Sequence, residues 1–382
     1  MGYPRVHFTS WCRIACVFLF ALAEFCTGCV RTYIPPPISS GAGILVVDGF
    51  INAGNDSTYI TLSRSAPLQD SAGIQKETNA FVYIEGSDYS LIALPEIQMG
   101  TYACAPFQAG TGVQYRLKIG TQNGSQYQSD FVPVQVSPPI DSVSWARTDS
   151  GSVTVYVTTH NPIDSEKFYL WTYTETWEFH PVYESYYVVE GGLWSPREDY
   201  LSLYTCWHTQ QSTNLLLANS SNLSHNIIYE NPIEHIVNNS WQISVDYSIL
   251  VEQQVLSAQA YNYYQVLKQN TELTGSLFDS QPTSINGNIH NVNNSLEPVI
   301  GQIYCSTVTE QRIFIHNNQL PNWYVHLPLP NDSCQLFSYG PGDDPAIAAG
   351  ILIPADLFGD VAEAACADCR LNGTNVMPFW WQ

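Results

Sequence analysis

Two acidic side chains at close spacing are the first candidates for catalysis. Glu175 and Glu178 lie in a segment, residues 168–179, where large and polar residues alternate as they do in a β-strand. Two carboxyl groups can act as acid and base on a glycosidic bond when they flank it. Residues three apart on a strand point to opposite faces of the sheet, so this pair cannot flank one bond unless a bulge intervenes. The spacing therefore argues against a glycosidase.

Short motifs for other reactions are missing from the sequence. Gly86-Ser87 and Gly275-Ser276 lack the second glycine of G-x-S-x-G, and neither a P-loop nor a dinucleotide fingerprint is present. Asp343-Asp344 lacks the alternating ligand spacing of an EF-hand, so a solvated acidic turn is the favoured interpretation. We therefore expect a protein that is not an enzyme, with no catalytic residue, no cofactor and no metal ion.

The N-terminus predicts export and lipid attachment. Arg5 and Arg13 precede an apolar run over residues 14–23, which has the length of a signal-peptide core and is too short to span a bilayer. The following Cys26-Thr27-Gly28-Cys29 resembles the lipobox of bacterial lipoproteins, in which a glycine precedes the cysteine that receives the lipid. We expect residues 1–28 to be removed, Cys29 to carry the lipid, and residues 29–43 to form a proline-containing tether. The alternatives are an ordinary cleaved signal or a disulfide cysteine.

Six further cysteines would then lie in an oxidising compartment and are disulfide candidates. They are Cys104, Cys206, Cys305, Cys334, Cys366 and Cys369. Their pairing cannot be deduced from the sequence, although Cys366 and Cys369 are close enough for a local bridge or for half of a metal site. Because there is no second C-x-x-C and no H-x-x-x-H spacing, structural disulfides are favoured over a metal or redox pair.

Composition limits the possible partners. The 382 residues include 13 Lys and Arg against 34 Asp and Glu, a net charge of −21, which argues against nucleic-acid binding through phosphate neutralisation. Aromatic residues make up 13% and charged residues only 12%, about half of the roughly 25% charged content of an ordinary soluble domain. This composition predicts a folded chain rather than a disordered one. Six tryptophans are candidates for ligand contact as a group, although core packing is the commoner role: Trp145, Trp171, Trp177, Trp194, Trp207 and Trp241.

Strand patterns dominate the elements that must position these residues. Short segments with a period of two, separated by turns, predict an immunoglobulin-like β-sandwich over residues 44–136. The paired prolines 138 and 139 predict a linker over residues 137–142. Residues 143–382 are expected to form a larger β-rich second domain with one principal helix near residues 257–269, which Ser257 can cap. Ala260, Tyr263, Tyr264 and Leu267 share one face of that helix, so we expect them to pack in the core.

Several motifs, in this order along the chain, resemble the domain-of-unknown-function 4249 lipoproteins of Bacteroidota. They include Leu45-Val46-Val47-Asp48-Gly49, Pro138-Pro139-Ile140-Asp141, Glu175-Thr176-Trp177-Glu178-Phe179, Cys206-Trp207, Gly287-Asn288-Ile289-His290, and Cys366-Ala367-Asp368-Cys369-Arg370. The resemblance covers nearly the whole mature chain. It implies an outer-membrane lipoprotein of a family often encoded beside TonB-dependent receptors. It does not determine whether the protein lies on the periplasmic or the cell-surface face of that membrane.

The expected function is therefore that of a non-catalytic accessory or binding subunit, working with a TonB-dependent transporter in nutrient uptake. The alternatives are a glycan-binding module and a surface hydrolase. An accessory subunit predicts an exposed apolar surface on the second domain. A glycan-binding module predicts solvent-facing aromatic side chains, and a hydrolase predicts a cleft with two carboxylates or with a nucleophile within reach of a base.

Overall fold

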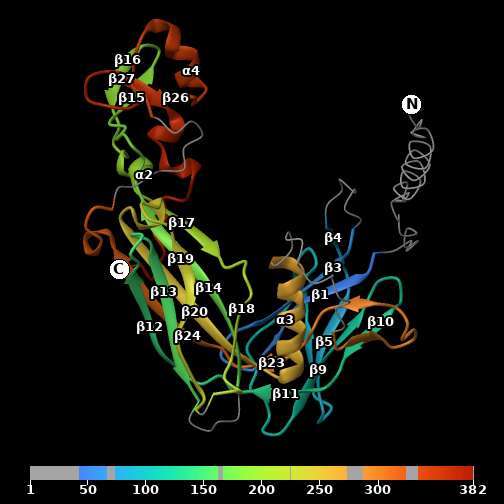
Figure 1. Cartoon of the computed structure of the whole chain (residues 1–382). Coiled ribbons are helices and arrows are strands. Elements are labelled where there is room, and N and C mark those ends of the chain that lie inside the picture. Colours follow the sequence, from blue (N-terminus) through green and yellow to red (C-terminus); the bar gives the residue numbers. More distant parts are fainter. Residues whose placement is uncertain are drawn as a thin grey trace, which may run out of the picture. The chain divides into compact units, whose positions relative to one another are not determined.

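The computed structural model describes residues 43–66, 74–161, 167–223, 225–272, 287–323 and 334–381 (Figure 1). The predicted signal peptide 1–28, the lipidation candidate Cys29 and all of the tether except Gly43 lie outside these residues. The predicted fold class, mainly β with an immunoglobulin-like sandwich, is confirmed. None of the helices in the described ranges is long and apolar enough to cross a membrane.

The first two sheets form the N-terminal sandwich. One sheet has the order β22-β1-β3-β8-β7, with β4 also paired to β3, and the other contains β2, β23, β11, β9, β10, β21, β5 and β6. The bounds in the first sheet are β1 Leu45–Gly49, β3 Thr58–Arg64, β4 Gln75–Lys76, β7 Glu96–Gln98, β8 Thr101–Cys104 and β22 Val299–Ile300. Those in the second are β2 Ile51–Asn52, β5 Phe81–Gly86, β6 Leu91–Leu94, β9 Gln114–Gly120, β10 Gln126–Ser129, β11 Val132–Gln135, β21 Ile289–Asn291 and β23 Cys305–Ser306. Side chains that alternate inward along these strands fill one apolar core between the sheets.

Three strands of this sandwich come from a part of the chain that the sequence assigned to the second domain. β22 pairs in parallel with β1, β23 pairs in parallel with β2 and β11, and β21 pairs with β10. The predicted boundary therefore differs from the structure, because residues 289–306 return to complete the sheets of residues 44–136. Strands of two or three residues have too short a pattern to show which sheet they join.

The predicted linker over residues 137–142 is also different in the structure. The next strand, β12, already begins at Ile140, and Ser137 is buried. The amide of Gln253 donates a hydrogen bond of 2.8 Å to the Pro138 carbonyl, and the Ser137 hydroxyl donates one of 3.1 Å to the Gln253 carbonyl. The prolines end one ladder, as expected, but the segment is packed between elements rather than solvated.

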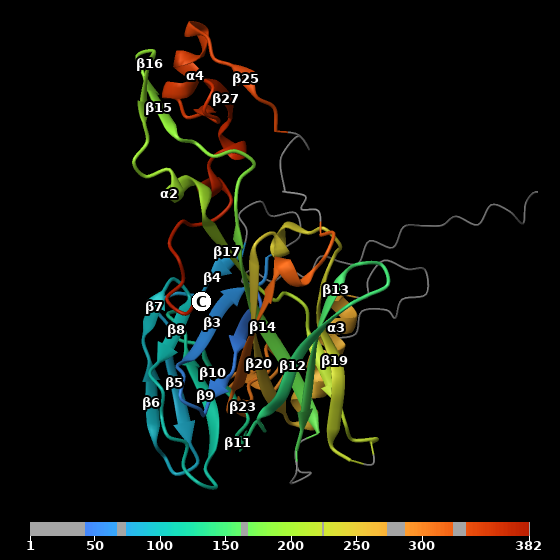
Figure 2. The ribbon, with the colours of Figure 1, turned by 90° about the vertical axis from the view of Figure 1, so that its left-hand side faces the viewer.

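A second sandwich follows, formed by a three-stranded and a five-stranded sheet (Figure 2). The three-stranded sheet has the order β12-β13-β19, and the other has the order β17-β14-β20-β24, with β18 also paired to β14. The bounds are β12 Ile140–Arg147, β13 Val153–His160, β19 Ile227–Ile236, β14 Phe168–Phe179, β17 Cys206–Gln211, β18 Leu216–Asn219, β20 Asp246–Leu256 and β24 Thr309–His316, with the 3-10 helices η1 Trp241–Ile243 and η2 Asn317–Gln319. The core between the sheets is rich in aromatic residues, among them Trp171 and Trp177.

The predicted principal helix is present as α3, Ala258–Glu272. The Ser257 hydroxyl accepts a hydrogen bond of 3.2 Å from the Ala260 amide, as a helix cap does. Ala260 and Tyr263 of the predicted face are buried, whereas Tyr264 and Leu267 are half-buried. Ala260 belongs to a small apolar cluster with Leu170, Leu256, Tyr261 and Tyr304, so α3 packs against residues of β14, β20 and the segment before β23.

Two remote segments form a third, small unit, which we call the stapled module and define as residues 181–205 and 334–372. Its elements are β15 Tyr187–Glu190, β16 Leu193–Pro196, α2 Leu201–Tyr204, β25 Phe337–Ser338, η3 Pro341–Asp343, α4 Asp344–Ala348, β26 Leu352–Pro354, β27 Asp360–Glu363, η4 Ala364–Cys366 and η5 Cys369–Leu371. The Tyr183 amide donates to the Cys366 carbonyl at 3.0 Å and the Tyr183 hydroxyl donates to the Cys334 carbonyl at 3.0 Å, which joins the two segments.

Candidate interaction site on the stapled module

Two disulfides hold the stapled module. Cys334 is bonded to Cys366 within the module, and Cys369 is bonded to Cys206 at the first position of β17. Cys366 and Cys369 thus form neither a local bridge nor half of a metal site, because Cys366 is bonded to Cys334 and Cys369 to Cys206. Between them, Asp368 accepts a hydrogen bond from the Arg370 amide and binds the Arg370 guanidinium at 2.8 Å.

Cys104 and Cys305 correct the disulfide prediction, because both are free thiols in the core of the N-terminal sandwich. They lie on β8 and β23, in different sheets. Burial raises the pKa of the Cys305 thiol to about 12 and also raises the pKa of Cys104. Both cysteines therefore act as small apolar core residues, a common role of buried cysteine that sequence position alone does not reveal.

The stapled module exposes more large apolar side chains than it buries. Its apolar cluster consists of the buried residues Ala355, Ala362, Cys366 and Ala367, with Tyr183, Cys334 and Ile353 half-buried around them. Val189, Leu203 and Val361 are also buried. The exposed members are Val182, Leu193, Leu201, Leu336, Phe337, Ile351, Leu357, Phe358 and Leu371.

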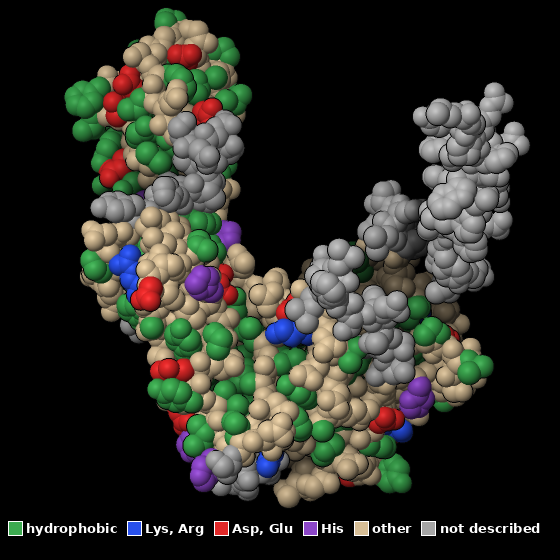
Figure 3. All heavy atoms as spheres, in the orientation of Figure 1, with side chains coloured by type: hydrophobic (Ala, Val, Ile, Leu, Met, Phe, Trp, Pro, Cys, Tyr) green, Lys and Arg blue, Asp and Glu red, His purple; other side chains and the backbone are tan. Residues whose placement is uncertain are grey.

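Two of these side chains are almost fully in solvent. Phe358, in the turn between β26 and β27, is 92% exposed, and Leu193, at the tip of the β15–β16 hairpin, is 77% exposed. In the space-filling view, apolar side chains appear at several places on the surface of this part of the chain (Figure 3). Single exposed apolar residues are common, but many on a unit with so small a core make this surface a candidate for an interaction site.

The C-terminal segment exposes a further apolar side chain, on the second sandwich. Thr374 pairs with Trp207 of β17 through backbone hydrogen bonds of 2.8 and 2.9 Å. The Trp380 ring lies 3.5 Å from the Arg312 guanidinium, while the adjacent Phe379 is 98% exposed. The segment is thus held at both ends and presents one free phenyl ring between them.

The carboxylates considered for catalysis do not form a site. Glu175 and Glu178 lie on opposite faces of β14, as predicted, because β14 pairs with β17 over Thr174–Phe179 without a bulge. Glu175 is 2% exposed and accepts hydrogen bonds from the Tyr247 hydroxyl at 2.9 Å and the Gln242 amide at 3.1 Å. Burial, and then the nearby Glu234 carboxylate, raises the pKa of Glu175 to about 7 against the lowering effect of those hydrogen bonds. A carboxyl group closed inside a core cannot touch a substrate.

The six tryptophans and the acidic pair Asp343-Asp344 lie in environments that packing and local hydrogen bonds explain. Trp171, Trp177 and Trp207 are buried, and Trp145, Trp194 and Trp241 are half-buried. Asp343 accepts a hydrogen bond from the Gly340 amide and Asp344 accepts one from the Tyr339 hydroxyl, at 2.9 and 2.6 Å. Within the described ranges, no group of three or more His, Cys, Asp or Glu side chains could hold a metal ion.

Sequence reasoning missed the stapled module because its halves lie more than a hundred residues apart. The available signal was indirect: closely spaced cysteines and a C-terminal region with apolar residues but no long strand pattern. A small unit with few large buried residues commonly depends on disulfides.

Comparisons with known proteins give a family match and distant structural similarity. The family model described as "Domain of unknown function (DUF4249)" matches residues 31–312, which include Cys206 but not Cys334, Cys366 or Cys369. No curated protein matches the chain. Among solved structures, a two-domain fibronectin type III segment of chicken tenascin has 12% identity and a TM-score of 0.16, with 56% of this chain and 90% of that chain covered. The FN1–FN3 domains of chicken CNTN1 have 13% identity and a TM-score of 0.17, with 56% and 62% covered.

Proposed function

The chain belongs to the DUF4249 family, and from that premise we propose that it is an outer-membrane lipoprotein that serves as a non-catalytic accessory subunit of a TonB-dependent transporter in nutrient uptake. In this proposal residues 1–28 are removed, Cys29 carries the lipid, and the stapled module contacts the transporter.

The observation that supports this function is the exposed apolar surface of the stapled module. Full burial of a leucine or phenylalanine side chain contributes about 1.5–3 kcal/mol, so Leu193 and Phe358 would contribute strongly to binding if a partner covered them. Aromatic side chains at the centre of an interface often dominate the binding energy. The two disulfides cross-link residues 334–372 internally and to β17, which limits the motion of the part that carries Phe358 and reduces the entropy lost on binding.

The charge of the chain is consistent with a lipid anchor. A net charge of −21 opposes direct adsorption to an anionic membrane surface. An acidic body of this kind stays near the membrane through a lipid or a protein partner rather than through its own surface charge. Lipid on Cys29 and apolar contacts on the stapled module would supply these two connections.

The alternative of a surface hydrolase has no support from the carboxylates. Among the described residues, Glu175 and Glu234 belong to one network, in which the Tyr173 hydroxyl donates to Glu234 and the Tyr247 hydroxyl donates to Glu175. Glu175, Tyr173 and Tyr247 are buried in the core of the second sandwich, whereas Glu234 is half-buried at its edge.

Affinity purification of the tagged full-length protein from outer membranes in mild detergent tests the proposal. We expect an outer-membrane transporter to co-purify, and the double variant Leu193→Ser/Phe358→Ser to lose most of it. The matched control is Tyr229→Ser/Leu296→Ser, which removes two equally exposed apolar side chains outside the stapled module and should leave co-purification unchanged. Recovery of the wild-type protein only as a monomer would contradict the transporter partner. Failure of metabolic palmitate to label wild-type protein, with Cys29→Ala as the comparison, would contradict the lipid anchor.

A further inference from the structure

The outer face of the N-terminal sandwich carries two aromatic side chains in solvent. Along β5, Val82 and Ile84 point into the core, while Phe81 and Tyr83 point outward and are 68% and 37% exposed. A strand at the surface of a sandwich usually alternates apolar and polar residues, so two successive outward aromatic residues indicate contact on the outer side too. β5 lies between β6 and β9, which extend this face on both sides (Figure 2).

A hollow of about 510 Å³ opens beside these aromatic side chains. It is lined by Phe81, Tyr83, Leu91, Lys118, Ile119, Gly120, Gln126, Tyr127, Gln128 and Val292. Gly120 of β9 explains the hollow. It lies opposite Phe81 on β5 and opposite Gln126 on β10, so no side chain fills the space between these two residues. The side chains of Ile119 and Tyr127 are buried on the core side, and the floor is therefore largely backbone.

Polar groups border the hollow on β9, next to the aromatic residues, and on β10 beyond it. Lys118 lies opposite Tyr83 on β5 and opposite Gln128 on β10, and the Gln128 amide is 3.2 Å from the His290 ring. Lys118 is the only charged residue among those lining the hollow, and its amine is 3.7 Å from Glu85. The lining therefore disfavours a cationic ligand and does not require an anionic one.

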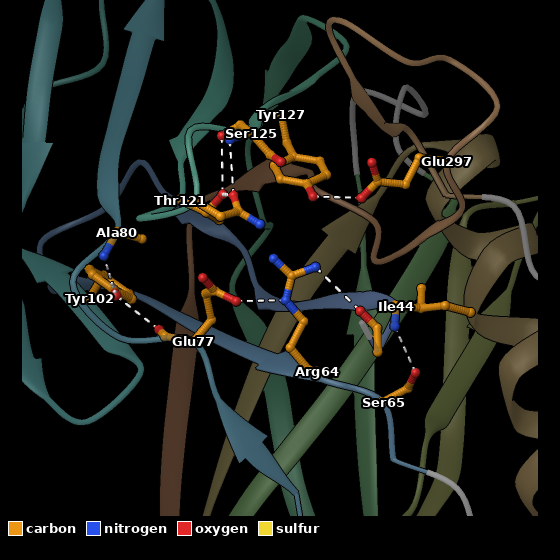
Figure 4. Close-up of polar contacts among 12 residues, drawn as sticks. Ile44, Arg64, Ser65, Glu77, Ala80, Tyr102, Thr121, Ser125, Tyr127 and Glu297 are labelled. Carbon is orange, nitrogen blue, oxygen red and sulfur yellow. Dashed lines mark hydrogen bonds and ion pairs between the residues drawn. The ribbon is translucent and has the colours of Figure 1, made fainter. Parts of the chain in front are cut away.

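Hydrogen bonds on the core side hold β10, which forms one wall of the hollow. The Tyr127 hydroxyl, on the core side, donates a hydrogen bond of 2.6 Å to Glu297 (Figure 4). The Asn291 amide donates one of 2.7 Å to the same carboxylate. These bonds connect β10 to the loop after β21. A site whose walls are held in this way needs little rearrangement to bind a ligand.

From this geometry we propose that the hollow is a saccharide-binding site, independent of the transporter contact proposed above. Exposed aromatic rings offer apolar faces on which a sugar ring can stack. The amides of Gln126 and Gln128 can both donate and accept hydrogen bonds, which matches the hydroxyl groups of a sugar, and Lys118 adds a further donor. The volume lies within the roughly 300–1,000 Å³ of small-molecule sites.

Binding of defined sugars to the full-length lipidated protein tests this site. The probes are maltohexaose, xylohexaose and chitohexaose, measured by titration calorimetry in a detergent without a sugar headgroup. We expect at least one probe to bind with a Kd between about 10 µM and 1 mM. Gly120→Leu should weaken that binding at least tenfold by filling the hollow, and a Cβ at Gly120 meets nothing closer than 3.8 Å, so the fold accommodates the change. The matched control is Gly342→Leu, at a glycine of the stapled module with open space around it.

Phe81→Ala provides a second variant that removes the aromatic wall from an exposed position. It should also weaken binding at least tenfold, whereas Tyr229→Ala, an equally exposed aromatic residue on β19, should have no effect. The proposal is overturned if no probe binds the wild-type protein, or if binding survives both Gly120→Leu and Phe81→Ala. Co-purification of a transporter is expected to be unchanged in both variants, so failure of either proposal can be recognised separately.

Discussion

Replacement of Glu175 by glutamine is expected to remove a pH dependence of stability. Glu175 has its pKa raised to about 7 from an ordinary value of 4.5, first because of burial and then because of Glu234. The folded protein thus binds this proton more tightly than the unfolded chain does. The associated stability is fully present below pH 4.5, where both states are protonated, and is lost as pH rises through about 7.

The size of the effect follows from the same shift. At about 1.4 kcal/mol per pKa unit, a rise from 4.5 to about 7 corresponds to about 3.5 kcal/mol of stability lost between acid and neutral pH. A glutamine of the same shape cannot ionise, and its oxygen can still accept the hydrogen bond from the Tyr247 hydroxyl. Glu175→Gln should therefore be similar to the wild-type protein near pH 4.5 and more stable than it by up to about 3.5 kcal/mol at pH 8.

Urea unfolding followed by tryptophan fluorescence at several values between about pH 4.5 and 8 measures this difference, with both disulfides kept oxidised. The control Glu190→Gln, at the exposed end of β15, should keep the wild-type slope of stability against pH. If Glu175→Gln keeps that slope as well, the argument that the buried carboxyl group resists ionisation is wrong.

Three further outcomes follow from the disulfides, the free thiols and one glycine. Replacing Cys206 and Cys369 together by serine opens a loop of 163 residues, which should lower the free energy of unfolding by about 5 kcal/mol and increase proteolysis of the stapled module. The two free thiols of the N-terminal sandwich should react with iodoacetamide only after unfolding, as judged by mass spectrometry, because burial raises the pKa of Cys305 to about 12. Gly49→Ala should cost more than about 2 kcal/mol in urea unfolding, since Gly49 has φ +125° and a Cβ there would lie 2.3 Å from the Tyr59 carbonyl oxygen.

The elements predicted correctly were those with a long repeating pattern or a clear local signal. The alternation over residues 168–179 gave the strand β14 and the opposite faces of Glu175 and Glu178, and Ser257 marked the start of α3. These features depend on neighbours in the sequence. Their geometry is fixed by the local period of the chain, so no knowledge of tertiary contacts is needed.

The features that the sequence did not reveal depend on contacts between distant residues. Cysteine pairing is one: Cys369 is bonded to Cys206 although Cys366 is only three residues away. The hollow is another, because Gly120 creates it only when Phe81 and Gln126 lie on either side, which requires the register of three strands. The sequence shows that Phe81 and Tyr83 alternate with Val82 and Ile84 in β5. It does not show which of the two faces would be covered by the core.

The return of residues 289–306 to the N-terminal sandwich implies that a fragment of residues 44–136 does not fold alone. Such a fragment lacks Ile289, Val299 and Ile303, which are buried in the core of this sandwich, as well as the buried Cys305. At about 1.5–3 kcal/mol for each large aliphatic side chain, the loss is about 5–9 kcal/mol, comparable with the whole stability of a typical domain. Circular dichroism of the fragment should therefore show no cooperative thermal transition, whereas a fragment extended over residues 44–316 should show one. A cooperative transition in the short fragment would mean that the returning strands only cover a sandwich that is already complete.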